Sequence, residues 1–226
     1  AARPGISRCP ERRVETGPNQ VWSWDITWLR RADQPGRDFY LYLFVDVWSR
    51  YVVGWSVETS ESDVRAAART KGIAERLGVV LNCLVLHAEN GGPMRGLNML
   101  AMLEWLGVMA SFSRPRVSDD NPFSEALFRT FKYRPGYPHK RGFADLAAAT
   151  SWVDAFVAWY NLEHLHSQIR YVTPSSRHFG QEPAILASRD HVYAVERQAH
   201  PERWSGRPSR DWSPIATVSL HPDRAA

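Results

Sequence analysis

A nearly unbroken apolar run at residues 39–47 is the feature that most constrains how this chain folds. A strand that is apolar on both faces lies in the middle of a sheet covered by helices on both sides. Strand-like runs flank it on either side, at residues 21–29 and 51–57. The short connection at residues 48–50 predicts a hairpin between the second and third strands.

Helices and shorter strands alternate after these three runs, as judged from apolar periodicity and from capping residues. We expect, in chain order, a helix over residues 60–78, a strand over 83–87, a helix over 99–107, a strand over 108–112, a helix that starts at Asn121-Pro122, a helix over 143–164, and a weaker helix over 183–198.

This order predicts an α/β domain: a mixed five-stranded sheet flanked by helices. We expect residues 21–164 to form this core and residues 165–226 to form a less regular C-terminal extension. Residues 1–20 are basic and polar, and we interpret them as an arm or as a linker from an upstream domain.

Three acids occupy unusual positions for structural residues. Asp25 lies in the middle of an aromatic strand, where strand propensity disfavours it. Glu89 directly follows a buried strand, and Glu125 lies near the start of a helix. Such positions converge at the open edge of a sheet. Carboxylate oxygens suit Mg²⁺ or Mn²⁺, and two such ions promote phosphoryl displacement.

Basic residues concentrate near the third acid. Residues 113–142 contain seven Lys and Arg residues against three acids, and this local excess indicates DNA binding better than the net charge of the whole chain does. Arg129 and Lys132 lie four and seven residues after Glu125, on the same helix face. They are candidate DNA-backbone contacts, with a solvated helix face as the alternative. Arg114 and Arg116 are further candidates.

Composition limits the class of protein further. The net charge is +4, and 25 of the 28 Lys and Arg residues are Arg, which makes bidentate contacts with phosphate. Cys9 and Cys83 form no pair motif, which predicts neither a disulfide framework nor a zinc site and fits a reducing cytosol. No apolar run is long enough for a membrane helix, so we expect no membrane partner.

Several short motifs follow one another along the chain: WSWDIT at 22–27, VDVWSRYVVGW at 45–55, LHAENGG at 86–92, SDDNPFSE at 118–125, WYN at 159–161, then His166 and Thr173-Pro174. In this order they resemble the integrase-core superfamily, in particular bacterial insertion-sequence transposases related to retroviral integrases. Thirty-five residues separate Glu89 from Glu125, which is the spacing of that family's DDE signature. The resemblance covers about residues 18–180.

The resemblance implies an RNase H-like fold in which Asp25, Glu89 and Glu125 are catalytic and hold two Mg²⁺ (or Mn²⁺) ions. It implies nicking of DNA at the ends of a mobile element, followed by strand transfer to target DNA. The partners would be double-stranded DNA and further copies of the chain, with an upstream helix-turn-helix domain, in the bacterial cytoplasm at the nucleoid. His87, Asn90 and Asp46 are candidates to support the three acids, although a structural role is an open alternative for His87 and Asp46.

One residue departs from the family pattern, in which the second acid is Asp. The extra methylene of Glu89 moves the carboxylate by up to roughly 1.5 Å. A misplacement of about 1 Å can cost on the order of 100-fold in rate. Two alternatives to an active transposase therefore stay open: a catalytically impaired DNA-binding or assembly module, and an RNase H-like nuclease without strand transfer.

Overall fold

The computed structural model describes residues 14–79, 83–114 and 120–220. Its strands are β1 (Val14–Glu15), β2 (Val21–Arg30), β3 (Asp38–Asp46), β4 (Val52–Glu58), β5 (Val85–Ala88), β6 (Met109–Phe112) and β7 (Val218–Ser219). Its helices are α1 (Asp63–Leu77), α2 (Gly92–Arg95), α3 (Leu97–Leu106), α4 (Pro122–Tyr133), α5 (Leu146–Leu162), α6 (Pro174–His178) and α7 (Glu182–Ala199), with 3-10 turns at Ser167–Ile169 and Pro201–Trp204.

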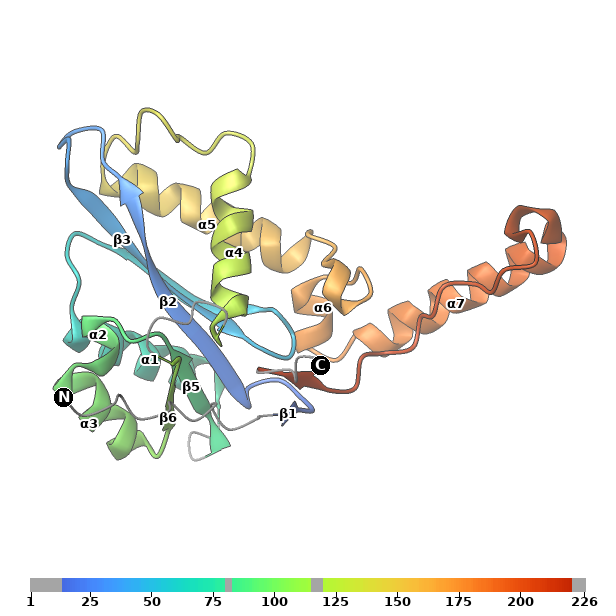
Figure 1. The fold of residues 1–226 in the computed structure, drawn as a ribbon, viewed down its shortest axis with the longest axis horizontal. Coiled ribbons are helices and arrows are strands. Elements are labelled where there is room, and N and C mark those ends of the chain that lie inside the picture. Colours follow the sequence, from blue (N-terminus) through green and yellow to red (C-terminus); the bar gives the residue numbers. More distant parts are fainter. Residues whose placement is uncertain (1–13, 80–82, 115–119, 221–226) are drawn as a thin grey trace, which may run out of the picture.

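Five strands form one mixed sheet in the order β4-β3-β2-β5-β6. The first three along the chain form an antiparallel meander, and β5 and β6 add to β2 in parallel. The predicted five-stranded sheet flanked by helices is thereby confirmed (Figure 1). The short β1 and β7, which the sequence pattern did not predict, pair with each other outside this sheet.

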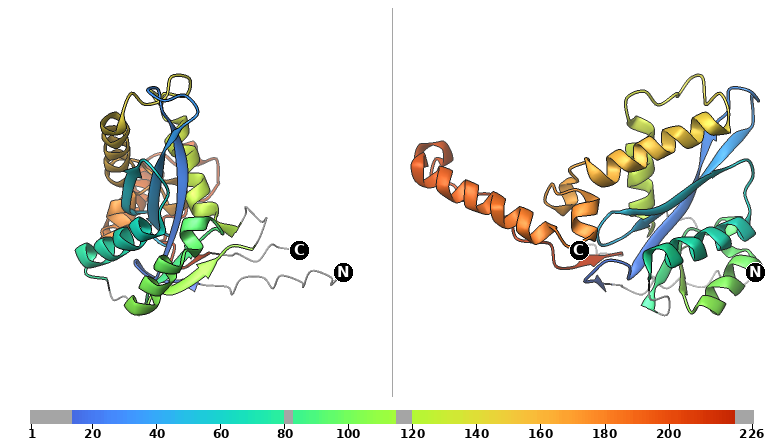
Figure 2. Two further views of the ribbon diagram at one scale, coloured as in Figure 1. Left: turned by 90° about the vertical axis from the view of Figure 1, so that its left-hand side faces the viewer. Right: turned by 180° about the vertical axis from the view of Figure 1, so that it is seen from behind.

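Side-chain alternation along β2 and β3 divides the core into two clusters. Trp22 and Trp24 alternate with Ser23 and Asp25, so the large aromatic residues lie on one face and the polar residues on the other. The aromatic face packs with α1 and α3, whereas the opposite face packs with α4 and α5. Two views at right angles show helices around the sheet (Figure 2). The sheet is therefore buried on both faces, as the apolar run predicts.

Two helix starts differ from the predicted positions. Ser62, not Ser60, caps α1, and its hydroxyl accepts from the Arg65 amide at 3.3 Å. The Ser60 hydroxyl instead accepts from the Arg65 guanidinium at 2.8 Å. Asp145 caps α5 by accepting from the Ala148 amide at 2.7 Å, so this helix begins later than residue 143.

Arg177 on α6 fastens the C-terminal extension to the core. Its guanidinium is fully buried and donates to Glu182 at 2.6 Å, to the Trp48 carbonyl at 2.9 Å and to the Ile215 carbonyl at 2.8 Å. These partners belong to α7, to the β3–β4 turn and to the segment that returns from α7. A buried cation requires hydrogen-bond acceptors, and these three come from separate segments of the chain. From this anchor α7 projects away from the sheet (Figure 1).

Within the described residues, no helix combines the length and the apolar character that crossing a membrane requires.

A close contact between β4 and α1 gives a test of this packing. A Cβ atom added at Gly54 would lie 2.2 Å from Ile73 Cδ1, whereas one added at Gly72 on α1 would meet nothing within 4 Å. We predict that Gly54→Ala lowers the free energy of unfolding by about 1–3 kcal/mol. The matched control Gly72→Ala should raise it by about 0.5–1 kcal/mol. Urea denaturation measures both, and equal effects would contradict the packing of β4 on α1.

Candidate active site

Strand register brings the first two acids to the same end of neighbouring strands. β2 and β5 are parallel, and Trp24 pairs with Ala88. Asp25 and Glu89 are the next residues along each strand, so they follow this pair at the carboxyl end of β5. In α/β proteins, ligands generally bind at the carboxyl ends of the parallel strands. The expected convergence of Asp25 and Glu89 thus follows directly from the pairing of β2 with β5.

Buried hydrogen bonds hold the start of α4 against β2. The Ser23 hydroxyl donates to Asn121 Oδ1 and lies 2.7 Å from the Ser124 hydroxyl, with all three side chains fully buried. Asn121 Nδ2 also reaches the Trp24 carbonyl at 3.5 Å. Asn121 precedes α4 as predicted, but its side chain makes no cap to the helix because it bonds to β2 instead. Glu125 follows Ser124 and is therefore carried to the Asp25 face of the sheet.

The electrostatics of Asp25 report how close the acids lie. Burial is the largest cause, and the negative charges of Glu89 and Glu125 add to it, so the pKa of Asp25 rises from 3.8 to about 7. The positive charge of Lys132 acts in the opposite direction. Burial lowers the pKa of Lys132, while Asp25 raises it. The structure thus brings together Asp25, Glu89, Glu125 and Lys132 as one charged cluster.

The donor set of this cluster fits a hard divalent cation in its chemistry. Three carboxylates crowd one edge of the sheet, and a cation would relieve the repulsion that raises the pKa of Asp25. In the described conformation, however, no three acidic, His or Cys side chains of the described residues are grouped closely enough to hold one ion. The carboxylates are neighbours without forming a closed set of ligands.

His87 and Asn90 brace the elements around Glu89. The buried His87 ring bridges the Ser111 hydroxyl, 3.0 Å from Nδ1, and the Asp120 carbonyl, 2.9 Å from Nε2. Asn90 Nδ2 donates to the Ser113 carbonyl at 2.7 Å. These contacts tie the end of β5 to the end of β6 and to the residues before α4.

Of the four predicted DNA contacts, Arg114 is engaged within the protein. Its guanidinium and its amide hold the Asp120 carboxylate in three hydrogen bonds of 2.8–2.9 Å. The partner is Asp120, six residues further on, and the sequence pattern did not predict this ion pair. Arg116 lies outside the described residues. Arg129 is exposed on α4, with its guanidinium 6.0 Å from the Tyr133 ring centroid.

Asp46 lies away from the acidic cluster. It pairs in register with Trp22, whereas Asp25 pairs with Leu43. Its carboxylate accepts from the Asn19 amide at 2.6 Å and from the Ser49 amide and hydroxyl at 2.7 and 2.6 Å. These bonds give Asp46 a part in shaping the β3–β4 turn.

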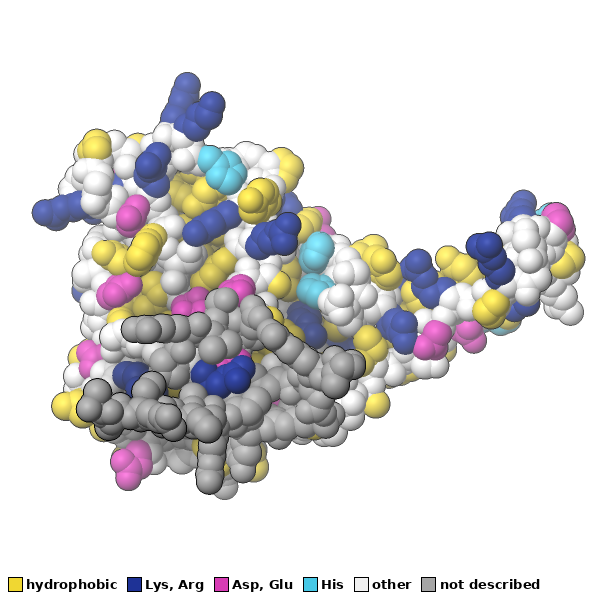
Figure 3. Space-filling view, viewed as in Figure 1, with side chains coloured by type: hydrophobic (Ala, Val, Ile, Leu, Met, Phe, Trp, Pro, Cys, Tyr) yellow, Lys and Arg dark blue, Asp and Glu magenta, His cyan; other side chains and the backbone are white. Residues whose placement is uncertain are grey.

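Charge on the surface is distributed around the acids. In the space-filling view, Lys and Arg side chains gather over α4 and the loop after it, next to acidic side chains near the middle of the same face (Figure 3). Basic and acidic side chains thus share this side of the molecule.

Two family models, both described as integrase core domain, match this chain at residues 15–118 and 106–174. Together they run from β1 to the start of α6 and include the whole sheet and the acidic cluster. The chain belongs to the integrase core family, and its fold is RNase H-like.

Curated relatives are insertion-sequence transposases. The chain is 26% identical over 175 residues to the transposase of IS904 from Lactococcus lactis, covering 70% of this chain and 61% of the relative. It is 32% identical over 117 residues to transposase InsF of IS3A from Escherichia coli K12, covering 52% of this chain and 39% of the relative. The chain thus spans from two fifths to three fifths of the relatives' lengths.

Among solved structures, the catalytic core domain of HTLV-2 integrase in complex with magnesium, in a dimeric form, matches with a TM-score of 0.51. The match covers 72% of this chain and 97% of that chain at 15% identity, so it shows a shared fold.

The raised pKa of Asp25 predicts a dependence of stability on pH. Between about pH 4 and pH 7 the folded chain binds more protons at Asp25 than the unfolded chain, so its free energy of unfolding falls as the pH rises. Asp25→Asn should remove this pH-dependent loss of stability. At about 1.4 kcal/mol per pKa unit, the full loss reaches about 4 kcal/mol. Urea unfolding in EDTA at pH 5 and pH 8 measures the difference.

Asp33 provides the matched control, because the Arg31 side chain lowers the pKa of this exposed carboxyl. Asp33→Asn should leave the decline between pH 5 and pH 8 in place. If the free energy of unfolding of Asp25→Asn fell between pH 5 and pH 8 as steeply as that of the parent chain, the burial and charge environment assigned to Asp25 would be wrong.

Proposed function

We propose that the chain is the catalytic core of a DNA transposase that nicks DNA at the ends of a mobile element and transfers the strand to target DNA. The observation that carries this proposal is the cluster of Asp25, Glu89 and Glu125 at one sheet edge, with Lys132 beside it. Membership in the integrase core family and the similarity to insertion-sequence transposases support it.

Asp25, Glu89 and Glu125 would hold two Mg²⁺ or Mn²⁺ ions. When bound, such ions activate the attacking water or 3′-hydroxyl and stabilise the charge on the attacking and leaving oxygens. With a pKa of about 7, Asp25 is partly protonated near neutral pH. It would lose this proton in order to bind a metal ion. The buried bonds of Ser23 with Asn121 and Ser124 would keep Glu125 opposite Asp25 during turnover.

Basic side chains on α4 would hold the DNA backbone. Lys132 lies near enough to Asp25 to influence its pKa, and Arg129 is exposed one turn nearer to Glu125. A phosphate beside the acids requires nearby cations, since the acids alone would repel it. Arg114 would act indirectly, by fixing Asp120 and the segment before α4. Arg116 remains a candidate DNA contact from the sequence.

We further propose that the chain acts as a homo-oligomer on double-stranded DNA in the bacterial cytoplasm, at the nucleoid. The similar HTLV-2 core forms a dimer, and the curated relatives are longer than the matched region. A helix-turn-helix domain upstream would supply recognition of the element ends.

Removal of the buried acid tests the proposed chemistry. We predict that Asp25→Asn lowers Mn²⁺-dependent cleavage of element-end DNA by at least about 100-fold, since changes to groups that only orient a ligand already cost about 10- to 100-fold. Asp33→Asn, which changes an exposed acid paired with Arg31, should cleave as the parent chain does. Gel assays at pH 8 measure both. Unchanged cleavage by Asp25→Asn would overturn the assignment.

The length of the second acid gives a separate test, because Glu89 stands where the family pattern has Asp. Glu89→Asp shortens the second acid to the family's length. We predict that it raises cleavage on the order of 10- to 100-fold, because a carboxylate misplaced by about 1 Å costs about that much. A lower rate would show that Glu89 already serves as a competent ligand, whereas an unchanged rate would count against a role of Glu89 in cleavage.

Strand transfer separates a transposase from a simple nuclease. A duplex with a pre-cut 3′-hydroxyl end, incubated with the chain, Mn²⁺ and a plasmid target, should yield joined products. Nicking without any joined product would favour the nuclease alternative.

A further inference from the structure

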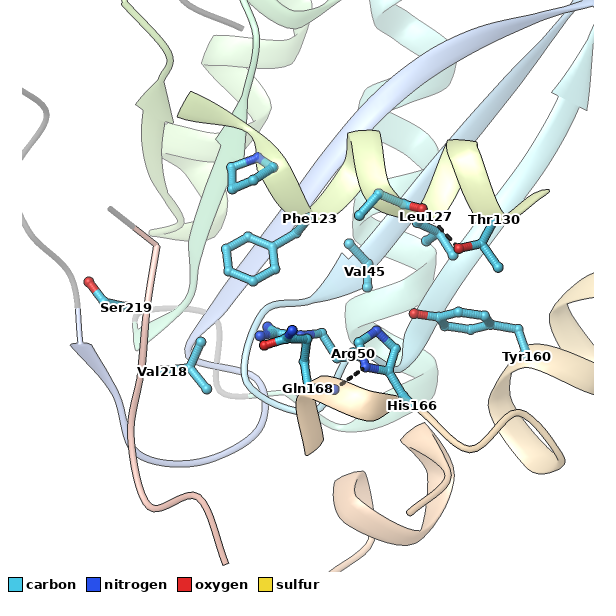
Figure 4. A pocket seen from close by; sticks show the side chains of 12 residues that line it. Val45, Arg50, Phe123, Leu127, Thr130, Tyr160, His166, Gln168, Val218 and Ser219 are labelled. Atoms are coloured by element: carbon cyan, nitrogen blue, oxygen red, sulfur yellow. Dashed lines mark hydrogen bonds between the residues drawn. The ribbon is translucent and has the colours of Figure 1, made fainter. Parts of the chain in front are cut away.

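A cavity of about 340 Å³ lies beside the acidic cluster, on another side of α4. It is enclosed by α4, the β3–β4 turn, the end of α5, the 3-10 turn at Ser167–Ile169 and β7 (Figure 4). Much of its wall is apolar, from residues such as Val45, Phe123, Leu127 and Val218. The polar side chains in it include Arg50, Tyr160 and His166.

Arg50 brings a largely buried positive charge to this cavity. Its backbone has a φ of 68°, which is sparsely populated for a residue with a side chain. Its guanidinium donates to the Val47 carbonyl and stacks 4.3 Å from the Phe123 ring centroid. Burial lowers the pKa of Arg50 to about 10, so the group stays charged at neutral pH.

The negative charges of Asp46 and Glu15 act to raise the pKa of Arg50, but neither carboxylate is paired with its guanidinium among the described residues. Within the described residues, Arg50 forms no ion pair, and the oxygens of Asp46 are bonded to Asn19 and Ser49. A guanidinium has five N–H donors, and one of them is bonded to Val47. A buried cation with spare donors is costly unless an anion or other acceptors meet it. The cavity offers space for such an acceptor.

Two further side chains of the cavity, Tyr160 and His166, can also donate hydrogen bonds. The Tyr160 hydroxyl points into the cavity (Figure 4), and burial raises its pKa, so it keeps its proton. Burial and the charge of Arg50 lower the pKa of His166 to about 4, so this ring is neutral. His166 Nδ1 accepts from the Gln168 amide at 3.2 Å, which assigns the ring proton to Nε2. The cavity therefore suits an anionic acceptor attached to an apolar or aromatic group.

The position of the cavity along α4 indicates which anion. Pro122, Ala126 and Thr130 line it, while Glu125 and Arg129 occupy the adjacent face of the same helix. An α-helix with its side chains is only about 10–12 Å across, so a DNA strand held at Arg129 passes close to the cavity on the adjacent face. An extruded nucleotide offers a phosphate and a flat base that stacks on aromatic side chains.

From these observations we infer that the cavity binds one nucleotide of a DNA strand, with its phosphate at Arg50 and its base against the Phe123 wall. This inference rests on the proposed function for its choice of DNA, but its chemistry is that of any phosphate joined to a flat ring. A free nucleotide has the same chemistry, and the experiment distinguishes the two sources.

Calorimetry with three probes tests the cavity: deoxyadenosine monophosphate, deoxyadenosine, and a single-stranded 12-mer of deoxyadenosine. Charge-assisted bonds to phosphate should make the monophosphate bind about 10- to 100-fold more tightly than the nucleoside. Arg50→Gln should abolish that difference. Gln168→Trp places a large ring at the exposed mouth and should weaken the monophosphate at least about 10-fold. Arg207→Gln, an exposed arginine in the C-terminal extension, should change nothing.

Competition decides the source of the nucleotide. If the 12-mer displaces the monophosphate from the parent chain, and loses this ability in Gln168→Trp, a DNA strand occupies the cavity. If the monophosphate binds through Arg50 while the 12-mer does not displace it, the assignment to DNA is overturned. Equal affinities of the parent chain, Arg50→Gln and Gln168→Trp for the monophosphate would overturn the site itself.

The outcome is separable from that of the proposed function. If the chain cleaves DNA but binds the monophosphate independently of Arg50 and Gln168, only the proposal of a nucleotide site in the cavity is overturned. If the chain binds the monophosphate through Arg50 but neither cleaves nor joins DNA, the nucleotide site stands and the proposed transposase activity is overturned. Thermal melting checks folding, and Gln168→Trp keeps the test decisive if Arg50→Gln unfolds.

Discussion

The site depends on one buried set of hydrogen bonds, that of Ser23 with Asn121 and Ser124. Ser23 lies two residues before Asp25 on the same face of β2, and Ser124 directly precedes Glu125. Because buried hydroxyl and amide groups require partners, this set aligns helix with strand. The two acids then lie close enough for Glu125 to help raise the pKa of Asp25. Loss of Ser23 would remove the buried partner that Asn121 Oδ1 and the Ser124 hydroxyl share.

Most of the fold could be predicted from patterns of neighbouring residues in the sequence. The apolar run at 39–47, the alternation along β2 and the Asn121-Pro122 helix start each follow from neighbouring residues, and the sheet confirms the predicted class. The bond between Ser23 and Asn121 joins residues 98 positions apart, so no local pattern predicts it. The buried role of Arg177 could not be predicted for the same reason, because its acceptors come from three separate segments. For the site, sequence predicted which acids to consider, whereas their shared electrostatics required the fold.

The helix α4 serves two surfaces of different chemistry. One face carries Glu125 with Arg129 and Lys132, where negative and positive charges alternate around the acids. Another face closes an apolar cavity around the Arg50 cation. A core that acts on DNA must hold the reacting phosphate and the rest of the strand at once, and one rigid helix can align both. Placing a site on such an element gives it more precision than a loop would.

The central claim is that Asp25, Glu89 and Glu125 form a divalent metal site, and Mn²⁺ binding by isothermal titration calorimetry at pH 8 tests it most directly. We predict that the parent chain binds Mn²⁺, that Asp25→Asn loses this binding, and that Asp33→Asn retains it. Binding of two ions would support a two-metal mechanism. Mn²⁺ binding that survives Asp25→Asn unchanged, or no binding by either the parent chain or Glu89→Asp with DNA present, would contradict the account.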